Sequence, residues 1–102
     1  MDVVQKIKRL VLRGNVLFTL KAEEEMMIDG LDEDLVVEAI MNAPAIAKRL
    51  RSKNPGTGRR EHLYVIVGVT FDGLVIYTKG KIAKLDDREV YYVFISSKKS
   101  TD

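Results

Sequence analysis

The spacing of apolar residues changes its period at Pro44. Before Pro44, apolar side chains recur every three or four residues, as they do on the buried face of an α-helix. After it, apolar residues alternate with their neighbours along residues 63–69 and in later segments, which is the period of a β-strand. Helices followed by strands with short connections predict an α+β fold.

Three helices are expected before Pro44. Thr19 and Asp32 carry short oxygen-bearing side chains that suit the N-caps of the second and third helices. Residues 16–18, between the first two helices, are expected to be a short extended link. The expected helices cover residues 3–13, 20–28 and 33–42.

Four strands are expected after Pro44, and short turns between consecutive strands favour antiparallel pairing. Turn-forming residues are concentrated in three places, at 54–58, 71–73 and 84–87. The polar tail, residues 98–102, is expected to fray. The chain is therefore expected to be a single domain, residues 1–102, with three N-terminal helices packed on a four-stranded antiparallel sheet. The expected strands cover residues 45–52, 63–69, 74–82 and 90–96.

The composition excludes several kinds of chemistry. With no cysteine, the chain has no disulfide, no thiolate nucleophile and no zinc–thiolate site. A single histidine disfavours a histidine-based metal site, and no cofactor is expected. No apolar run reaches the ~18–20 residues that span a bilayer, and the N-terminus lacks a signal-peptide pattern. A cytoplasmic protein without a membrane partner is expected.

The charges are strongly segregated along the chain, although the net charge is only +2. Residues 22–47 hold eight acids and no base, whereas residues 48–60 hold six bases and no acid. Such a distribution can steer a polyanion to one side of a nearly neutral protein. The alternative interpretation is that these are ordinary solvated surface charges.

The strand expected at residues 74–82 carries a candidate binding surface. Side chains alternate along a strand, so Tyr77, Lys79 and Lys81 project from the same face. Lysines suit phosphate oxygens, and a tyrosine ring can stack on a base. The alternative interpretation is an edge strand that lysines protect against aggregation.

The basic strand expected at residues 45–52 offers a second set of candidates. Lys48 shares a face with Ile46 and Leu50, whereas Arg49 and Arg51 lie on the opposite face and are candidates for RNA binding. A lysine beside two aliphatic residues either extends along the rim to solvent or lies half-buried with a lowered pKa.

His62 is a candidate general acid or base, because imidazole titrates near neutral pH. The alternative interpretation is a surface residue at the start of a strand. No serine or cysteine nucleophile motif accompanies it, so a hydrolase triad is unsupported. The composition instead favours a substrate that supplies its own nucleophile, as RNA does through its 2′-hydroxyl.

Several segments together cover nearly the whole chain: VVQKIKRLVLRGNVLFTLKAEEEMMIDGLDEDLVVEAIMNA and then KRLRS, EHLYVI, DGLVIYTKGKI and EVYYVFISSKK. These segments resemble the MqsR-type mRNA interferase toxins. The resemblance implies a RelE-like toxin fold, cleavage of single-stranded mRNA without a metal, and inhibition by a cognate antitoxin protein encoded nearby.

The resemblance also implies roles for particular residues. Lys48 matches the family's functional lysine, Tyr77 fits its tyrosine to within one residue, and Lys98 is nearest to its last cation. The family's glutamine is replaced by Leu63, and His62 beside it is the candidate substitute. The expected function is a toxin-type endoribonuclease with catalytic Lys48, His62, Tyr77 and Lys98. The alternative is a non-catalytic RNA-binding or antitoxin-binding module on the same fold.

Overall fold

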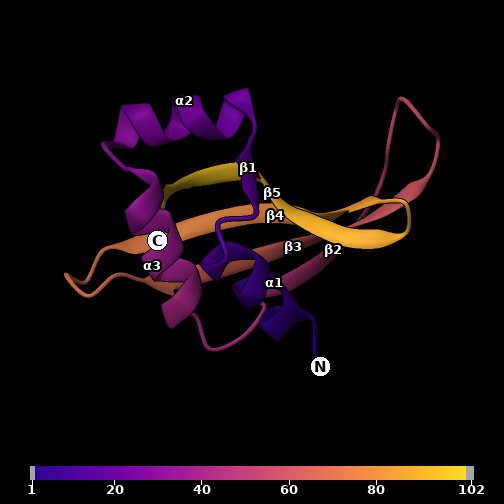
Figure 1. The fold of residues 1–102 in the computed structure, drawn as a ribbon. Coiled ribbons are helices and arrows are strands. Elements are labelled where there is room, and N and C mark those ends of the chain that lie inside the picture. Colours follow the sequence, from indigo (N-terminus) through magenta and orange to yellow (C-terminus); the bar gives the residue numbers. More distant parts are fainter. Residues whose placement is uncertain (1, 101–102) are drawn as a thin grey trace.

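The computed structural model describes residues 2–100 as three helices and a five-stranded mixed sheet (Figure 1). The α+β class is confirmed and three helices are present. The expectations of four strands, and of helices that all precede the strands, are wrong, because β1 lies between α1 and α2. The sheet has the order β1-β5-β4-β3-β2. The elements are α1 (Val3–Leu12), β1 (Val16–Phe18), α2 (Leu20–Asp29), α3 (Glu33–Asn42), β2 (Lys48–Lys53), β3 (Arg60–Val69), β4 (Val75–Leu85) and β5 (Arg88–Lys99).

The fifth strand is β1, which the sequence indicated only as an extended link. It pairs in parallel with the middle of β5, with Val16 opposite Tyr92 and Phe18 opposite Phe94. A backbone hydrogen bond from Thr19 N to the Phe94 carbonyl, 3.0 Å long, extends this pairing by one residue. The sheet is therefore mixed and not purely antiparallel.

The strands after Pro44 are shifted or longer than expected. β2 begins at Lys48, and Ile46 before it packs against the core, so Ile46 is not a strand neighbour of Lys48. β5 continues through Lys98 and Lys99, which corrects the expectation of a frayed tail there. Residues 101–102 of that tail lie outside the described residues.

Helix starts follow the expected capping chemistry. The Thr19 hydroxyl accepts a hydrogen bond from Ala22 N at 3.1 Å, and an Asp32 carboxylate oxygen accepts one from Leu35 N at 2.8 Å. At the end of α2, Gly30 adopts φ 68°, a left-handed conformation that glycine reaches without strain.

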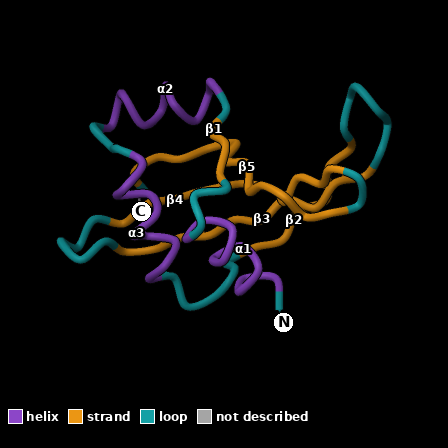
Figure 2. Tube along the Cα trace, viewed as in Figure 1, coloured by secondary structure: helices purple, strands orange, loops and turns teal. Residues whose placement is uncertain are grey.

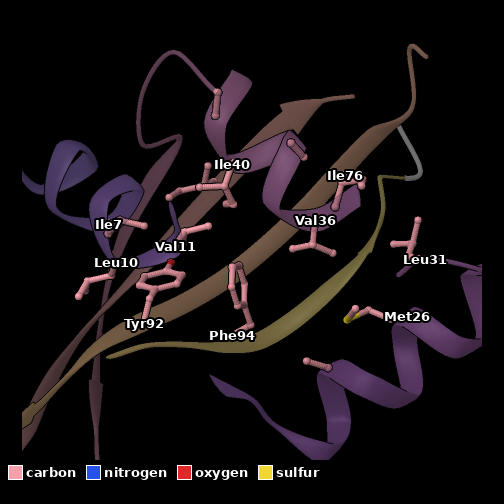
Figure 3. Close-up of a cluster of buried hydrophobic side chains, with 14 residues drawn as sticks. Ile7, Leu10, Val11, Met26, Leu31, Val36, Ile40, Ile76, Tyr92 and Phe94 are labelled. Atoms are coloured by element: carbon pink, nitrogen blue, oxygen red, sulfur yellow. The ribbon is translucent and has the colours of Figure 1, made fainter. Parts of the chain in front are cut away.

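The helices gather on one side of the sheet (Figures 1 and 2). α3 packs against β3, α2 lies along β5, and α1 contacts α3 and β5. Where α3 crosses β3, a Cβ at Gly68 would lie 1.8 Å from the Ala39 carbonyl oxygen, so this close approach requires glycine. The buried core that results joins all three helices to the sheet (Figure 3); its labelled members are Ile7, Leu10, Val11, Met26, Leu31, Val36, Ile40, Ile76, Tyr92 and Phe94.

The alternation along β4 separates the two faces of the sheet. Ile76 is fully buried in the core, and Thr78 and Gly80 face the same way and are buried. Tyr77 and Lys79 therefore project from the opposite face, which we call the open face. No helix among the described residues is long and apolar enough to cross a membrane.

Candidate nucleic-acid interface

Two lysines of the open face lie in one row across the sheet. Lys48 on β2 is opposite Val65 on β3, and Val65 is opposite Lys79 on β4. Adjacent strands are ~4.8 Å apart, so the two lysine backbones are roughly 10 Å apart across one valine. Val65 is 7% exposed yet is not part of the helix-side core, so the lysines flank an apolar strip.

The neighbouring row brings Tyr77 together with Lys98. Tyr77 on β4 is opposite Lys98 on β5, and the Lys98 Nζ lies 5.6 Å from the centroid of the Tyr77 ring. That distance is within the range of a cation–π contact. Lys98 Nζ also lies 4.0 Å from a carboxylate oxygen of Glu25 on α2, which restrains the lysine beside the ring.

Lys81 also projects from the open face, but its charge is already paired. Its Nζ is 3.1 Å from Glu61 Oε1, and the Asn54 side-chain amide donates a hydrogen bond of 2.8 Å to the same oxygen. The Asn54 amide and then the Lys81 ammonium lower the pKa of Glu61 below its ordinary value. The expected phosphate contact of Lys81 is thus weaker than that of Lys79, which forms no ion pair among the described residues.

Three of the expected site residues lie on the other face. Arg49 is opposite Tyr64, whose ring packs against the core, and Arg51 is opposite His62. The Arg49 guanidinium carbon is 6.0 Å from the Tyr64 ring centroid. His62 is therefore separated by the sheet from Lys48, Tyr77 and Lys98. The alternation from His62 to the buried Ile66 was a signal in the sequence that could have placed it there.

A hollow, which sequence reasoning missed, lies where β3 and β4 separate. Pairing of β3 with β4 ends at Tyr64 opposite Gly80. Beyond that point, β2 and β3 continue as one ribbon and β4 and β5 as another, ending in separate turns. We call the space between these ribbons the fork; it encloses about 510 Å³ and is lined by Asn54, Thr57, Arg59, Arg60, Glu61, His62, Tyr64, Lys81, Ile82, Ala83, Lys84 and Glu89.

The candidate interface is thus an open sheet face with one tyrosine and four lysines: Lys48, Tyr77, Lys79, Lys81 and Lys98. Within residues 2–100, no group of three or more His, Cys, Asp and Glu side chains could hold a metal ion. No known protein family, curated protein or solved structure matches this chain.

Proposed function

We propose that this protein is a toxin-type endoribonuclease that binds single-stranded RNA on the open face and cleaves it without a metal ion. The observation that carries the proposal is the grouping of Lys48, Lys79 and Lys98 around Tyr77 on a face without helices. Lys48 and Lys79 form no ion pair within residues 2–100, so their charges are free to meet a polyanion.

Single-stranded RNA suits this surface better than a duplex. Unstacked bases are recognised by aromatic side chains exposed on sheets, while neighbouring cations hold the phosphates. Tyr77 is half-buried at the centre of the open face, and its ring is held by Lys98. A base stacked there would place the adjoining phosphate within reach of Lys79, two residues along the same strand.

The proposed reaction is transfer of the phosphodiester to the neighbouring 2′-hydroxyl. The 2′-oxygen attacks phosphorus and loses its proton, the bond from phosphorus to the 5′-oxygen breaks, and that oxygen gains a proton. The products are a 2′,3′-cyclic phosphate and a 5′-hydroxyl. Lys48 and Lys79 stabilise the charge that grows on the phosphate oxygens. The Lys98 ammonium is the candidate donor of the proton that the 5′-oxygen gains, and the Tyr77 hydroxyl is the candidate that relays the 2′ proton to solvent.

His62 is left out of this mechanism. It is exposed on the opposite face from Tyr77 and Lys48, so it cannot contact a phosphate bound between them. His62 therefore has no part in the proposed chemistry. Arg49 and Arg51 lie on the same face as His62, so they make no contacts on the open face.

The test is cleavage of RNA in EDTA by the pure protein and two variants. Lys48→Met removes one charge and keeps most of the side chain, and should lower the cleavage rate by about two orders of magnitude. Tyr77→Phe keeps the ring, so loss of cleavage with retained RNA binding would assign the hydroxyl to proton transfer. Arg13→Met, on the exposed end of α1, is the matched control. Full cleavage by both folded site variants would refute the proposed mechanism.

The second candidate function is RNA binding without cleavage. Two observations favour it: the only histidine lies off the open face, and Glu61 is held by Asn54 and Lys81. The same experiment separates the two functions. Binding that depends on Lys48 and Lys79, with intact RNA recovered, would support the binding module.

A protein partner belongs to the same proposal. The exposed side of α2 carries Leu20, Met27 and Ile28, which are 71%, 81% and 84% exposed, beside Glu23 and Glu24. Apolar anchors with an acidic rim would suit an antitoxin with a basic docking segment. Association with the product of a neighbouring gene should weaken with salt and with Met27→Glu. Association that ignores both changes would place the antitoxin elsewhere.

A further inference from the structure

The fork between the two ribbons has the size and polarity of a small-molecule site. Its volume of about 510 Å³ lies within the ~300–1,000 Å³ that is usual for ligand pockets. Its inner wall combines the half-buried Tyr64 ring with Ile82 and Ala83. Exposed basic residues, Arg59, Arg60 and Lys84, lie among its lining residues.

The charge of the fork is positive after its ion pairs are counted. Glu61 is paired with Lys81, and Glu89 is paired with Lys6 of α1 at 3.2 Å. Both acidic lining residues are thereby neutralised, one of them by a base outside the fork. Arg59, Arg60 and Lys84 have no ion-pair partner among residues 2–100, which leaves three positive charges for an anion.

The strands that border the fork also leave backbone groups unpaired. β3 lacks a β4 partner from Arg60 to Leu63, and β4 lacks a β3 partner from Lys81 to Leu85, whereas both strands keep their outer partners. Each strand therefore turns N–H donors and C=O acceptors toward the space between them. A planar heterocycle with both donors and acceptors on its edge complements such a border.

A polar network links the two ribbons across the fork. The Asn54 side-chain amide donates a hydrogen bond to Glu61, and Asn54 Oδ1 accepts one from Gly56 N at 2.8 Å. Glu61 in turn accepts a hydrogen bond from Lys81 on the other ribbon. One carboxylate thus connects the 54–58 loop to both ribbons.

From these observations we propose that the fork binds a nucleoside phosphate, with the phosphate on Arg59, Arg60 and His62 and the base against Tyr64 between the strand edges. The ligand is either a free nucleotide or one nucleotide of an RNA strand. The site shares Lys81 with the open face but uses other residues for the phosphate and the base, and its occupancy does not require the cleavage proposed above. It also gives His62 a role in phosphate contact that the open face does not.

The test is a titration of the full chain with adenosine 5′-monophosphate, followed by amide chemical shifts. Shifts should concentrate at residues 59–64 and 81–84, and inorganic phosphate should compete. Arg59→Gln and His62→Ala should each raise the Kd severalfold or more, because each removes a polar contact to the phosphate. Arg88→Gln, an exposed base at the tip of the second ribbon that does not line the fork, should change the Kd by less than about twofold.

An RNA hexanucleotide distinguishes the two sources of the ligand. If RNA is the occupant, the hexanucleotide binds more tightly than the mononucleotide, and Arg59→Gln weakens both. If a free nucleotide is the occupant, Arg59→Gln weakens only the mononucleotide. Shifts confined to the open face, no shifts at all, or equal losses in Arg59→Gln and Arg88→Gln would overturn the fork site. Absence of RNA cleavage would overturn the proposed nuclease and leave the fork result standing.

Discussion

Tyr92 is the largest fully buried side chain, and its hydroxyl has no hydrogen-bond partner among residues 2–100. Its ring meets Phe94 edge-on, with 5.0 Å between the centroids. The ring also lies where a side chain at position 80 would be: a Cβ on Gly80 would come within 2.6 Å of the Tyr92 ring. The ring therefore stabilises the core, while the hydroxyl contributes a buried polar group without compensation.

Tyr92→Phe is expected to raise the free energy of unfolding by about 1 kcal/mol, because an unpaired buried hydroxyl is removed and the ring is kept. Chemical denaturation of the two proteins measures the difference. Tyr91→Phe, on the exposed neighbouring position, is the control and should leave stability nearly unchanged. A loss of more than 1 kcal/mol in Tyr92→Phe would mean that the hydroxyl has a partner in solution.

Tyr92 is also expected to make the folded state less stable at alkaline pH. Burial, and secondarily the neighbouring Tyr64, raise the pKa of Tyr92 above its ordinary value of 10.0. Above about pH 10 the unfolded chain loses this proton and the folded chain keeps it, so stability falls as pH rises. Unfolding measured from pH 9 to 11 should show a smaller decline for Tyr92→Phe than for the parent protein.

At the scale of elements, α2 completes an edge of the sheet that β1 is too short to cover. β1 ends opposite Phe94, and the Thr19 hydroxyl donates a hydrogen bond of 3.2 Å to the Ile95 carbonyl, so the outer edge of β5 has no strand partner from Ile95 onward. Glu25 accepts hydrogen bonds from the Ser96 hydroxyl and Ser97 N, at 2.7 and 3.2 Å, and Asp29 accepts one from Lys99 N at 2.8 Å. Two carboxylates one helical turn apart thus replace a neighbouring strand.

Glu25→Ala is expected to lower the free energy of unfolding by about 1–3 kcal/mol, because it leaves buried Ser96 and Ser97 without their acceptor. Glu24→Ala, one residue earlier and exposed, is the matched control and should cost less than about 0.5 kcal/mol. Both values come from denaturant unfolding. Equal effects at the two positions would show that the edge contacts contribute nothing beyond helix propensity.

The β4–β5 hairpin closes on Asp86 and Asp87, which both have positive φ, 52° and 63°. Leu85 pairs with Arg88 across this two-residue turn, a geometry that prefers glycine at the second position. Asp87→Gly is therefore expected to raise the melting temperature, with a gain of about 0.5–1 kcal/mol. Asp72→Gly, in the other tight turn, tests whether a similar gain follows from any added glycine. A lower melting temperature for Asp87→Gly would contradict the turn assignment.

The elements with local signals could be predicted, and those with distant partners could not. Caps and apolar periods fixed the helices, and alternation placed Tyr77 and Lys79 on one face. The three residues of β1 are too few to show a period, and their partner at 92–94 is far along the chain. In the sequence, Lys98 has the appearance of a polar tail residue, because Glu25, with which it forms an ion pair, lies in another element. The fork begins where β3–β4 pairing stops, at Gly80; a glycine inside a strand indicates a local irregularity but does not by itself predict a hollow.

At the scale of the whole molecule, acidic residues gather on α2 and α3, whereas basic residues lie on both faces of the sheet. The acidic stretch 22–47 forms α2 and α3, while Lys48, Lys79 and Lys98 lie on the open face. The net charge of +2 is small, but a polyanion that approaches the open face meets positive groups there. The local distribution of charge can therefore attract a polyanion although the whole protein is nearly neutral.

Three lysines of the open face, Lys48, Lys79 and Lys98, predict the salt dependence of RNA binding. Each neutralised phosphate of a single strand contributes about −0.7 to the slope of log K against log salt, so a slope of about −2 is expected. Lys79→Met should reduce that slope by about 0.7, whereas Lys21→Met, on α2, should not change it. Binding of a fluorescent oligonucleotide at several salt concentrations measures both. A slope near zero would exclude the open face as a phosphate-binding surface.

The parallel pairing of β1 with β5 determines when the sheet can be completed during synthesis. Positions 16 and 92 are 76 residues apart, and β5, which follows β1 to β4 in the chain, lies between β1 and β4. Synthesis runs from the N-terminus, so β1 has no partner, and Tyr77 has no Lys98 beside it, until β5 has been made. A nascent chain has no assembled interface before that point. If the protein cleaves RNA as proposed, a chain still on the ribosome cannot cut RNA until β5 has emerged.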